Sequence, residues 1–306
     1  MNIWITGSSG FIGSHLLENL LVKGYQVSCF SNNKILLENK ASLNQSVHYL
    51  DFSSTEDMNN KIDTFGCPEI FVHLGWGDMT IPMSDFHLSG NVDNSNKLIK
   101  NFFLRGLKKF IFVGSMNEYG SRTGPLSENM KPEGRLINYA KGKLKVSQYG
   151  FETAAIYNKT FIHVRPFYVY GPGQRDGSLI NDIFDAYTRE TLPTLGPCNY
   201  YRDYIHVKDV AEGICRTMGL ESSSKINLGI GSYIMVQDFV KIFWNILGGD
   251  SNDLIFGRKE MMKDEPDQPK SFADITNLIE LTGWKPEYSI EEGIRETISI
   301  LNKNRK

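Results

Sequence analysis

Short apolar runs alternate with longer segments of helical periodicity through the first two thirds of the chain. Runs such as residues 110–113 (Phe-Ile-Phe-Val) are apolar throughout, which is typical of strands covered on both sheet faces. The pattern predicts strands at 2–6, 26–31, 47–50, 70–74, 109–114 and 160–165, and helices near 11–23, 55–64, 86–105 and 138–156. This alternation indicates an α/β fold with a doubly wound parallel sheet.

Glycine- and proline-marked loops replace this rhythm after about residue 166. We therefore expect a sheet-forming domain over residues 1–166 and a smaller, mainly substrate-binding lobe over 167–306. Segments near 203–230 are expected to return to the first domain. A chain of 306 residues is long enough for two such lobes.

Composition narrows the range of partners. The chain has 33 Lys and Arg against 35 Asp and Glu, a formal charge of −2, which argues against nucleic acid or an anionic membrane recognised by bulk charge. The four dispersed cysteines, without a C-x-x-C pair, are typical of reduced thiols in a cytoplasmic protein. The six histidines have no metal-ligand spacing, so no metal site is predicted. No signal peptide or membrane span is evident, and a cytoplasmic location is expected.

A glycine-rich turn follows the first predicted strand and opens the first predicted helix. Its spacing, G-x-x-G-x-x-G, is one residue longer at the first gap than the dinucleotide-binding fingerprint. Glycines permit a tight turn and close approach to a pyrophosphate, and the helix N-terminus offers N–H groups to the phosphates. Residues 1–166 are therefore expected to be a dinucleotide-binding Rossmann domain, with cofactor contacts from Gly7, Ser9, Gly10, Phe11, Ile12 and Gly13.

The segment after the second predicted strand bears on the choice of cofactor. An acidic residue about 20 residues past the glycines would bind the ribose 2′-hydroxyl of NAD, but this chain has Ser31, Asn32 and Lys34 there. Without a carboxylate a 2′-phosphate is not repelled, and these three side chains could contact it, so NADP(H) is favoured over NAD(H). Asp51 is a candidate for the adenine amino group, and a helix N-cap is its alternative role.

Tyr139 and Lys143 are four residues apart in a predicted helix, a spacing that puts both side chains on one face. A free tyrosine titrates near pH ~10, so it exchanges protons at neutral pH only if a nearby cation favours its phenolate. Lys143 is the expected cation, together with a positively charged ring nearby. Lowering the tyrosine pKa by about three needs roughly 4 kcal/mol. An ordinary surface pair is the alternative interpretation.

The glycine turn and the Tyr139/Lys143 pair together resemble the extended short-chain dehydrogenase/reductase family, which includes nucleotide-sugar epimerases, dehydratases and 4-ketoreductases. The matching stretches cover nearly the whole chain, at 6–13, 51–52, 72–74, 113–120, 139–143, 164–173, 202–207 and 282–286. The resemblance implies that Ser115 hydrogen-bonds the sugar, that Tyr139 passes the proton and that Lys143 holds the nicotinamide ribose. It also implies cofactor contacts by Phe52 and Leu74, and a homodimer formed by the helices near 86–105 and 138–156.

Contacts with a nucleotide-sugar substrate are expected from five further residues. Arg202 suits the phosphates because a guanidinium binds phosphate oxygens in a bidentate manner, and Arg258 is a weaker candidate of the same kind. The set is completed by Asp78, Asn117 and Asn181.

Departures from the family patterns separate its reactions. The dehydratases carry acidic residues one or two positions after the catalytic hydroxyl, and the fucose-type epimerase-reductases carry Cys two positions after it, but this chain has Met116 and Asn117. Glu118 is one position too late and is expected to face away on the turn. Simple 4-epimerisation and 4-ketoreduction need only Ser115, Tyr139 and Lys143.

The missing acidic residue after the second strand favours reduction. The function expected from the resemblance is therefore NADPH-dependent reduction of a nucleotide-linked 4-keto-6-deoxy sugar, in deoxysugar or polysaccharide biosynthesis. Two alternatives stay open, an NAD-dependent nucleotide-sugar 4-epimerase and a non-catalytic NADP-binding sensor or scaffold.

Overall fold

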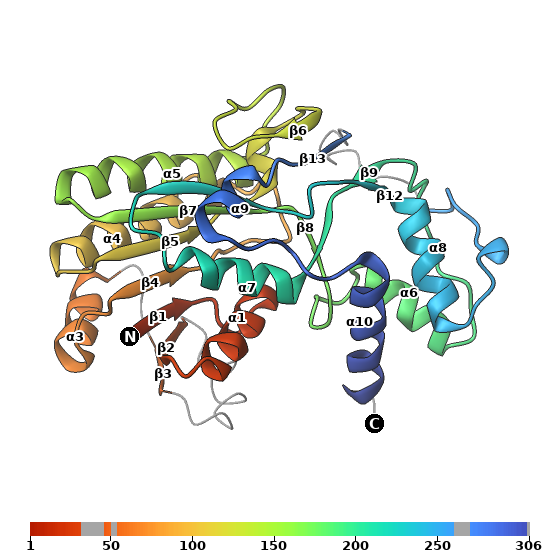
Figure 1. The fold of residues 1–306 in the computed structure, drawn as a ribbon, viewed down its shortest axis with the longest axis horizontal. Helices are drawn as coiled ribbons and strands as arrows, with labels where there is room; N and C mark the ends of the chain where they lie inside the picture. Colours follow the sequence, from red (N-terminus) through yellow and green to blue (C-terminus); the bar gives the residue numbers. More distant parts are fainter. Residues whose placement is uncertain (32–45, 50–53, 260–269, 305–306) are drawn as a thin grey trace.

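The computed structural model describes residues 1–31, 46–49, 54–259 and 270–304 (Figure 1). Within them a seven-stranded sheet has the order β11-β7-β5-β4-β1-β2-β3, and every neighbouring pair is parallel. Its strands are β1 (Asn2–Thr6), β2 (Gln26–Ser31), β3 (Ser46–Tyr49), β4 (Ile70–His73), β5 (Lys109–Val113), β7 (Thr160–Pro166) and β11 (Ser224–Leu228). The predicted doubly wound α/β fold is confirmed.

The central strands are apolar on both faces because each face packs against helices. Side chains alternate across a strand, and here the alternation sorts them by type. Aliphatic side chains such as Ile3, Ile5 and Ile111 belong to one buried cluster, whereas Trp4 and Phe110 belong to another on the opposite face. This explains why the strands lack the polar alternation of a half-exposed sheet.

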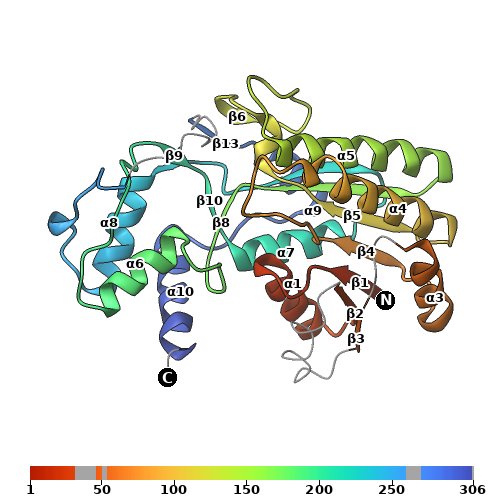
Figure 2. The same ribbon diagram turned by 180° about the vertical axis from the view of Figure 1, so that it is seen from behind.

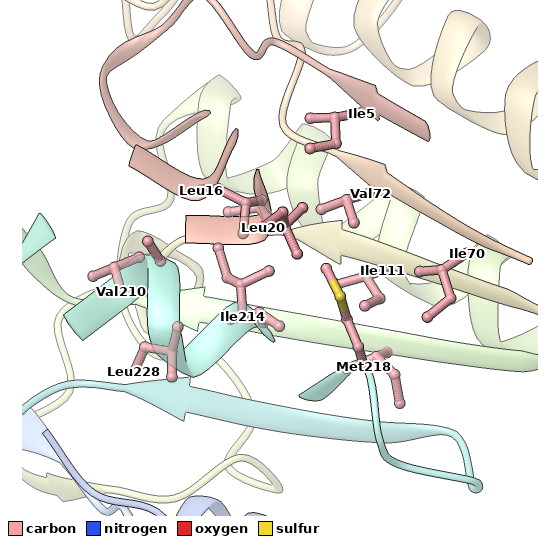
Figure 3. Packing of buried hydrophobic residues seen from close by; sticks show 14 of the residues in the cluster. Ile5, Leu16, Leu20, Ile70, Val72, Ile111, Val210, Ile214, Met218 and Leu228 are labelled. Atoms are coloured by element: carbon pink, nitrogen blue, oxygen red, sulfur yellow. The ribbon is translucent and has the colours of Figure 1, made fainter. Parts of the chain in front are cut away.

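The aliphatic face is covered by α1 (Phe11–Val22), α7 (Val207–Thr217) and α9 (Thr276–Thr282). Figure 3 shows Leu16 and Leu20 of α1 and Ile214 of α7 packed over the strand residues Val72 and Ile111. The aromatic face is covered by α3 (Thr55–Phe65), α4 (Gly90–Leu104) and α5 (Asn138–Tyr157) (Figure 2). A short 3-10 helix, η2 (Asp85–His87), precedes α4, so the helix predicted near 86–105 is divided.

A separate lobe lies beside the sheet in both views and has a hydrophobic cluster of its own (Figure 1, Figure 2). Its helices are α6 (Leu179–Thr188), α8 (Val236–Leu247) and α10 (Ile290–Asn304). In the described part of the chain, three strand pairs lie outside the main sheet: β8 (Tyr168–Tyr170) with β10 (Tyr204–His206), β9 (Tyr201–Arg202) with β12 (Ile234–Met235), and β6 (Gly124–Leu126) with β13 (Ser271–Ala273).

The region 203–230 is divided between the two parts. β11 is an edge strand of the main sheet and α7 covers the sheet, whereas β10 pairs with β8. Asp203, just before β10, accepts hydrogen bonds from the backbone N–H groups of Ile230, Gly231 and Ala273. No helix among the described residues is long and apolar enough to cross a membrane.

Candidate active site

A cavity of about 750 Å³ lies where β1, β4 and β5 end. The carboxyl ends of parallel strands meet at one edge of a sheet, which is where ligands bind in open α/β folds. The loops that follow these strands, the helices α1, α4 and α5 and the neighbouring lobe contribute to the lining. The lining residues are Gly7, Ser9, Gly10, Phe11, Ile12, Gly13, His73, Leu74, Gly75, Trp76, Gly77, Met79, Phe86, Asn91, Asn94, Ser95, Val113, Gly114, Tyr139, Lys143, Gln174, Arg175 and Ser178.

The glycine turn is closed so tightly that two of its positions exclude any side chain. Gly7 has φ +73°, and a Cβ there would lie 2.8 Å from the backbone nitrogen of Gly75. A Cβ at Gly13 would lie 2.1 Å from the carbonyl oxygen of Gly7. Gly10 is the N-cap of α1 and makes no side-chain cap bond, so the helix presents its first N–H groups to the cavity edge. A pyrophosphate fits this cradle.

All seven cofactor-contact residues predicted in the glycine turn and at Leu74 line this one cavity. Tyr139 and Lys143 line it as well. The side chain of Ser31 and the residues Asn32, Lys34, Asp51 and Phe52 lie outside the described residues. The predicted contacts with the 2′-phosphate and the adenine therefore stay predictions.

Ser115, Tyr139 and Lys143, which are predicted from two distant segments, come together beside β5. Ser115 is the N-cap of the 3-10 helix η3 (Met116–Tyr119), and its hydroxyl is hydrogen-bonded to the Tyr139 hydroxyl. Lys143 is 3% exposed, and its Nζ donates to the carbonyl oxygen of Val113 at 2.8 Å. The same Nζ lies 3.9 Å from the centre of the Trp76 ring, within the range of a cation–π interaction.

The pKa values of this pair differ from the sequence-based expectation. Burial raises the pKa of Tyr139 to about 12; the hydrogen bond from Ser115 lowers it and the charge of Glu118 raises it. Burial lowers the pKa of Lys143 to about 7, against the opposing effect of Glu118. The expectation that Lys143 depresses the tyrosine pKa is therefore wrong for the protein by itself. The desolvation that both groups share is the larger effect.

Trp76 is held in place by a buried histidine. Its Nε1 donates to Nδ1 of His87 at 2.9 Å, so the proton of the neutral ring is on Nε2, which donates to the carbonyl oxygen of Ile81 at 3.0 Å. A Cβ at Gly142 would lie 2.3 Å from the carbonyl oxygen of His87. A glycine between Tyr139 and Lys143 therefore lets α5 approach this wall closely.

A second buried histidine joins the glycine turn to α4. His73 Nδ1 lies 2.6 Å from Thr6 Oγ1, and its Nε2 lies 3.0 Å from Ser95 Oγ. Thr6 Oγ1 accepts the N–H of Gly75, and Ser95 donates to the carbonyl of Asn91. Burial lowers the pKa of His73 to about 3, so the ring is neutral and each polar group has a partner.

Sequence reasoning missed the polar lining contributed by α4. Asn91, Asn94 and Ser95 have the i, i+3, i+4 spacing that places residues on one helix face. That spacing was a usable signal, because a polar stripe in the first turns of a helix that follows a buried strand faces the same edge as the glycine turn. Arg175 and Ser178 come from the lobe and had no comparable signal.

The five predicted substrate residues lie outside the described cavity lining. Asp78 is exposed, and its Oδ2 accepts from Ser84 Oγ at 2.5 Å. Asn117 is part of η3, where its N–H donates to Ser115 Oγ at 3.2 Å. The Asn181 amide donates to the carbonyls of two lining residues, Gln174 and Arg175.

The two arginines of that set differ in environment. Arg202 is buried, with its guanidinium 4.0 Å from the ring centre of Tyr168 and 4.5 Å from that of Tyr200. Arg258 is exposed. Stacking holds the Arg202 guanidinium in one plane, which suits bidentate recognition. The substrate contacts of all five residues stay predictions.

The Glu118 side chain is fully buried behind the turn that carries it. Its carboxylate accepts hydrogen bonds from Ser115 N, His163 Nε2 and Arg165 Nε. Glu118 is not among the lining residues of the described cavity. The partners that the sequence did not indicate are two basic residues on β7, 45 and 47 residues further along the chain. Elsewhere among the described residues, no group of three or more His, Cys, Asp or Glu side chains could hold a metal ion.

The fold, the glycine cradle and the Ser115/Tyr139/Lys143 set define an NAD(P)-dependent enzyme of the short-chain dehydrogenase/reductase type. The model of the NAD dependent epimerase/dehydratase family matches residues 3–229, and the chain belongs to this family. UDP-glucuronate 4-epimerase of Thermodesulfobacterium geofontis is 26% identical over 319 residues, which are 98% of this chain and 96% of the relative.

CDP-abequose synthase of Salmonella typhimurium is 24% identical over 309 residues, 97% of each chain. The crystal structure of UDP-glucose 4-epimerase with UDP-glucose from Thermotoga maritima superposes with a TM-score of 0.86. The two sequences are 25% identical, and the superposition covers 100% of each chain. The relatives span different products, so family membership leaves the reaction open.

Proposed function

We propose that this protein is an NADPH-dependent 4-ketoreductase acting on a nucleotide-linked 4-keto-6-deoxy sugar. The observation that carries the proposal is the chemistry of the cavity lining. Its described residues include one proton-transfer pair, Tyr139 and Lys143, and neither a carboxylate nor a thiol. Dehydration and epimerisation next to the carbonyl each need a further acid or base, so hydride transfer with a single proton is favoured.

The protonation state of Tyr139 suits the reductive direction. With its pKa raised to about 12, the side chain is a phenol at neutral pH and can donate a proton. A nicotinamide dinucleotide, when bound, supplies the hydride that a carbonyl carbon accepts. Tyr139 gives its proton to the carbonyl oxygen, Ser115 donates a hydrogen bond to the same oxygen, and Lys143 stabilises the phenolate until solvent returns a proton.

Two features support the identity of cofactor and sugar. The chain has Ser31, Asn32 and Lys34 at the end of β2, where NAD-binding proteins have an acidic residue that holds the ribose 2′-hydroxyl, so NADPH is favoured. Trp76, Met79 and Phe86 make part of the cavity wall apolar, as a sugar with a methyl group at C6 requires. Arg202, whose guanidinium contacts the rings of Tyr168 and Tyr200, is proposed to bind the phosphates of the nucleotide.

An NAD-dependent nucleotide-sugar 4-epimerase is the second candidate, because the same three residues serve it and relatives with that name match nearly the full chain. The test is a panel of nucleotide-linked 4-keto-6-deoxy sugars with NADPH or NADH, followed by loss of nicotinamide absorbance. Oxidation of NADPH supports the reductase. Interconversion of ordinary nucleotide hexoses without added cofactor, together with no NADPH oxidation, would support the epimerase instead.

We also propose a homodimer through α4 and α5. These helices pack side by side and carry the exposed apolar side chains Leu104 and Ile156, which are 57% and 77% accessible. Light scattering after gel filtration would measure the mass. A charged residue at both positions should shift a dimer toward the monomer, and a monomeric native protein would refute the proposal.

A further inference from the structure

A buried carboxylate lies directly behind the catalytic serine. Glu118 Oε1 accepts from the backbone nitrogen of Ser115 at 2.9 Å and from His163 Nε2 at 3.1 Å. Its Oε2 accepts from Arg165 Nε at 2.9 Å. Ser115 and Glu118 form a capping box, in which each residue satisfies a backbone N–H of the same turn.

The backbone next to Ser115 is packed closely against the same two side chains. A Cβ at Gly114 would lie 2.2 Å from His163 Nε2 and 2.3 Å from Glu118 Oε1. The backbone just before Ser115 therefore lies against the carboxylate and the imidazole. Glycine at position 114 permits that approach, because any side chain there would collide with His163 and Glu118.

The same carboxylate is linked to the helix that carries the proton donor. His163 Nε2 donates to Glu118, so its Nδ1 accepts from the hydroxyl of Ser147 at 2.8 Å. Ser147 is one helical turn beyond Lys143 and two beyond Tyr139, on one face of α5. Buried hydrogen bonds thus connect Glu118 to the Ser115 backbone and, through His163, to Ser147 on the helix that carries Tyr139 and Lys143.

The negative charge of Glu118 also acts on Lys143, which has no carboxylate in direct contact among the described residues. Among the described residues, no carboxylate oxygen lies within 4 Å of Lys143 Nζ, whose hydrogen-bond acceptor is the Val113 carbonyl. The charge of Glu118 favours the protonated form of Lys143. The other ionisable groups facing Glu118 are Arg165, His163, Lys225 and Tyr139.

We propose that Glu118 is a positioning residue of the reaction: it fixes the Ser115 hydroxyl against Tyr139, and its negative charge favours the protonated form of Lys143. This role rests on the proposed functions of Ser115, Tyr139 and Lys143, and it holds equally for a reductase and for an epimerase. Glu118 touches neither reacting atom, so it acts through the residues that do.

The proposed effect of Glu118 on the protonation of Lys143 is tested without any substrate. The protein is produced with lysine that carries ¹³C at Cε. The NMR signal of Lys143 is identified because it is absent from the Lys143→Met variant. The titration midpoint of Lys143 is then measured by NMR. In Glu118→Gln the midpoint should fall by about one pH unit, the low end of shifts caused by a neighbouring opposite charge. Glu128→Gln removes another buried carboxylate that makes no contact with Ser115, and should leave the midpoint unchanged.

An unchanged Lys143 midpoint in Glu118→Gln would overturn the charge role. If the unpaired Arg165 prevents this variant from folding, Glu118→Gln is made in an Arg165→Met background and compared with Arg165→Met alone. The same downward shift is expected there. Because this titration needs no sugar, its outcome is independent of whether the proposed substrate is correct.

The proposed positioning of Ser115 is tested with Glu118→Asp. This variant keeps the carboxylate charge, but its shorter side chain places the carboxylate further from Ser115 N. The Lys143 midpoint should stay within about 0.3 pH unit of wild type, whereas kcat for the substrate found in the panel should fall at least about tenfold with KM for the cofactor unchanged. Wild-type kcat in Glu118→Asp would overturn the positioning role. A fall in cofactor affinity of the same size would show general disruption of the fold and would overturn it as well.

Discussion

Replacing Lys143 with methionine should stabilise the protein at neutral pH while abolishing its activity. Lys143 is 3% exposed, and burial lowers its pKa from 10.5 to about 7. That difference corresponds to a net cost of about 5 kcal/mol for the charged form, in which the charge of Glu118 already offsets part of the desolvation. The native ammonium recovers ~1 kcal/mol from the hydrogen bond to Val113 and ~1 kcal/mol from the Trp76 ring, contacts that methionine lacks.

The net gain in Lys143→Met is therefore roughly 1–3 kcal/mol at pH 7, since methionine fills a similar volume without a charge. The pH dependence has a definite sign. Between pH 7 and 10.5 the unfolded chain keeps a proton on Lys143 that the folded chain has lost, so wild-type stability gains from this group as pH rises. The advantage of Lys143→Met should shrink by about 2 kcal/mol between pH 7 and pH 9.

The assay is urea unfolding of wild type and Lys143→Met at pH 7 and at pH 9, with the m-values compared to confirm two-state behaviour. Lys141→Met is the matched control, because Lys141 is exposed on the same helix and should change stability by less than about 0.5 kcal/mol at either pH. A methionine variant that is less stable than wild type at pH 7, or whose advantage is the same at both pH values, would refute the reasoning.

Two further substitutions test the site. Tyr139→Phe should lower kcat by about 10²–10⁴-fold with cofactor affinity unchanged, because it removes the proton donor but keeps the ring against Trp76 and His87; turnover within tenfold of wild type would contradict the assignment. Gly13→Ala should weaken cofactor binding at least about tenfold in a fluorescence titration, since its Cβ would lie 2.1 Å from Gly7 O; undiminished affinity would show that the turn does not hold the pyrophosphate.

The fold could be predicted from the sequence because its signals are local. An apolar strand such as β5 and a glycine turn directly before α1 need only a few neighbouring residues to be recognised. The helix face shared by Tyr139 and Lys143 follows from spacing alone, and the structure brings Ser115 to it.

What the sequence could not show depends on contacts between distant segments. Glu118 is buried because His163 and Arg165 on β7 neutralise it, and no pattern around residue 118 indicates those partners. The raised pKa of Tyr139 likewise depends on how completely the loops after β4 and β5 remove water. Desolvation is a property of the packed site, and a spacing rule carries no information about it.

The direction of hydride transfer is the central claim, and an isotope experiment tests it most directly. The protein is incubated with NADPH that carries deuterium at the transferred C4 position and with a nucleotide-linked 4-keto-6-deoxy sugar, and the product is examined by mass spectrometry and NMR. A 4-ketoreductase places one deuterium on C4 of the sugar for each NADPH oxidised. Sugar interconversion without deuterium in the product and without NADPH consumption would contradict it.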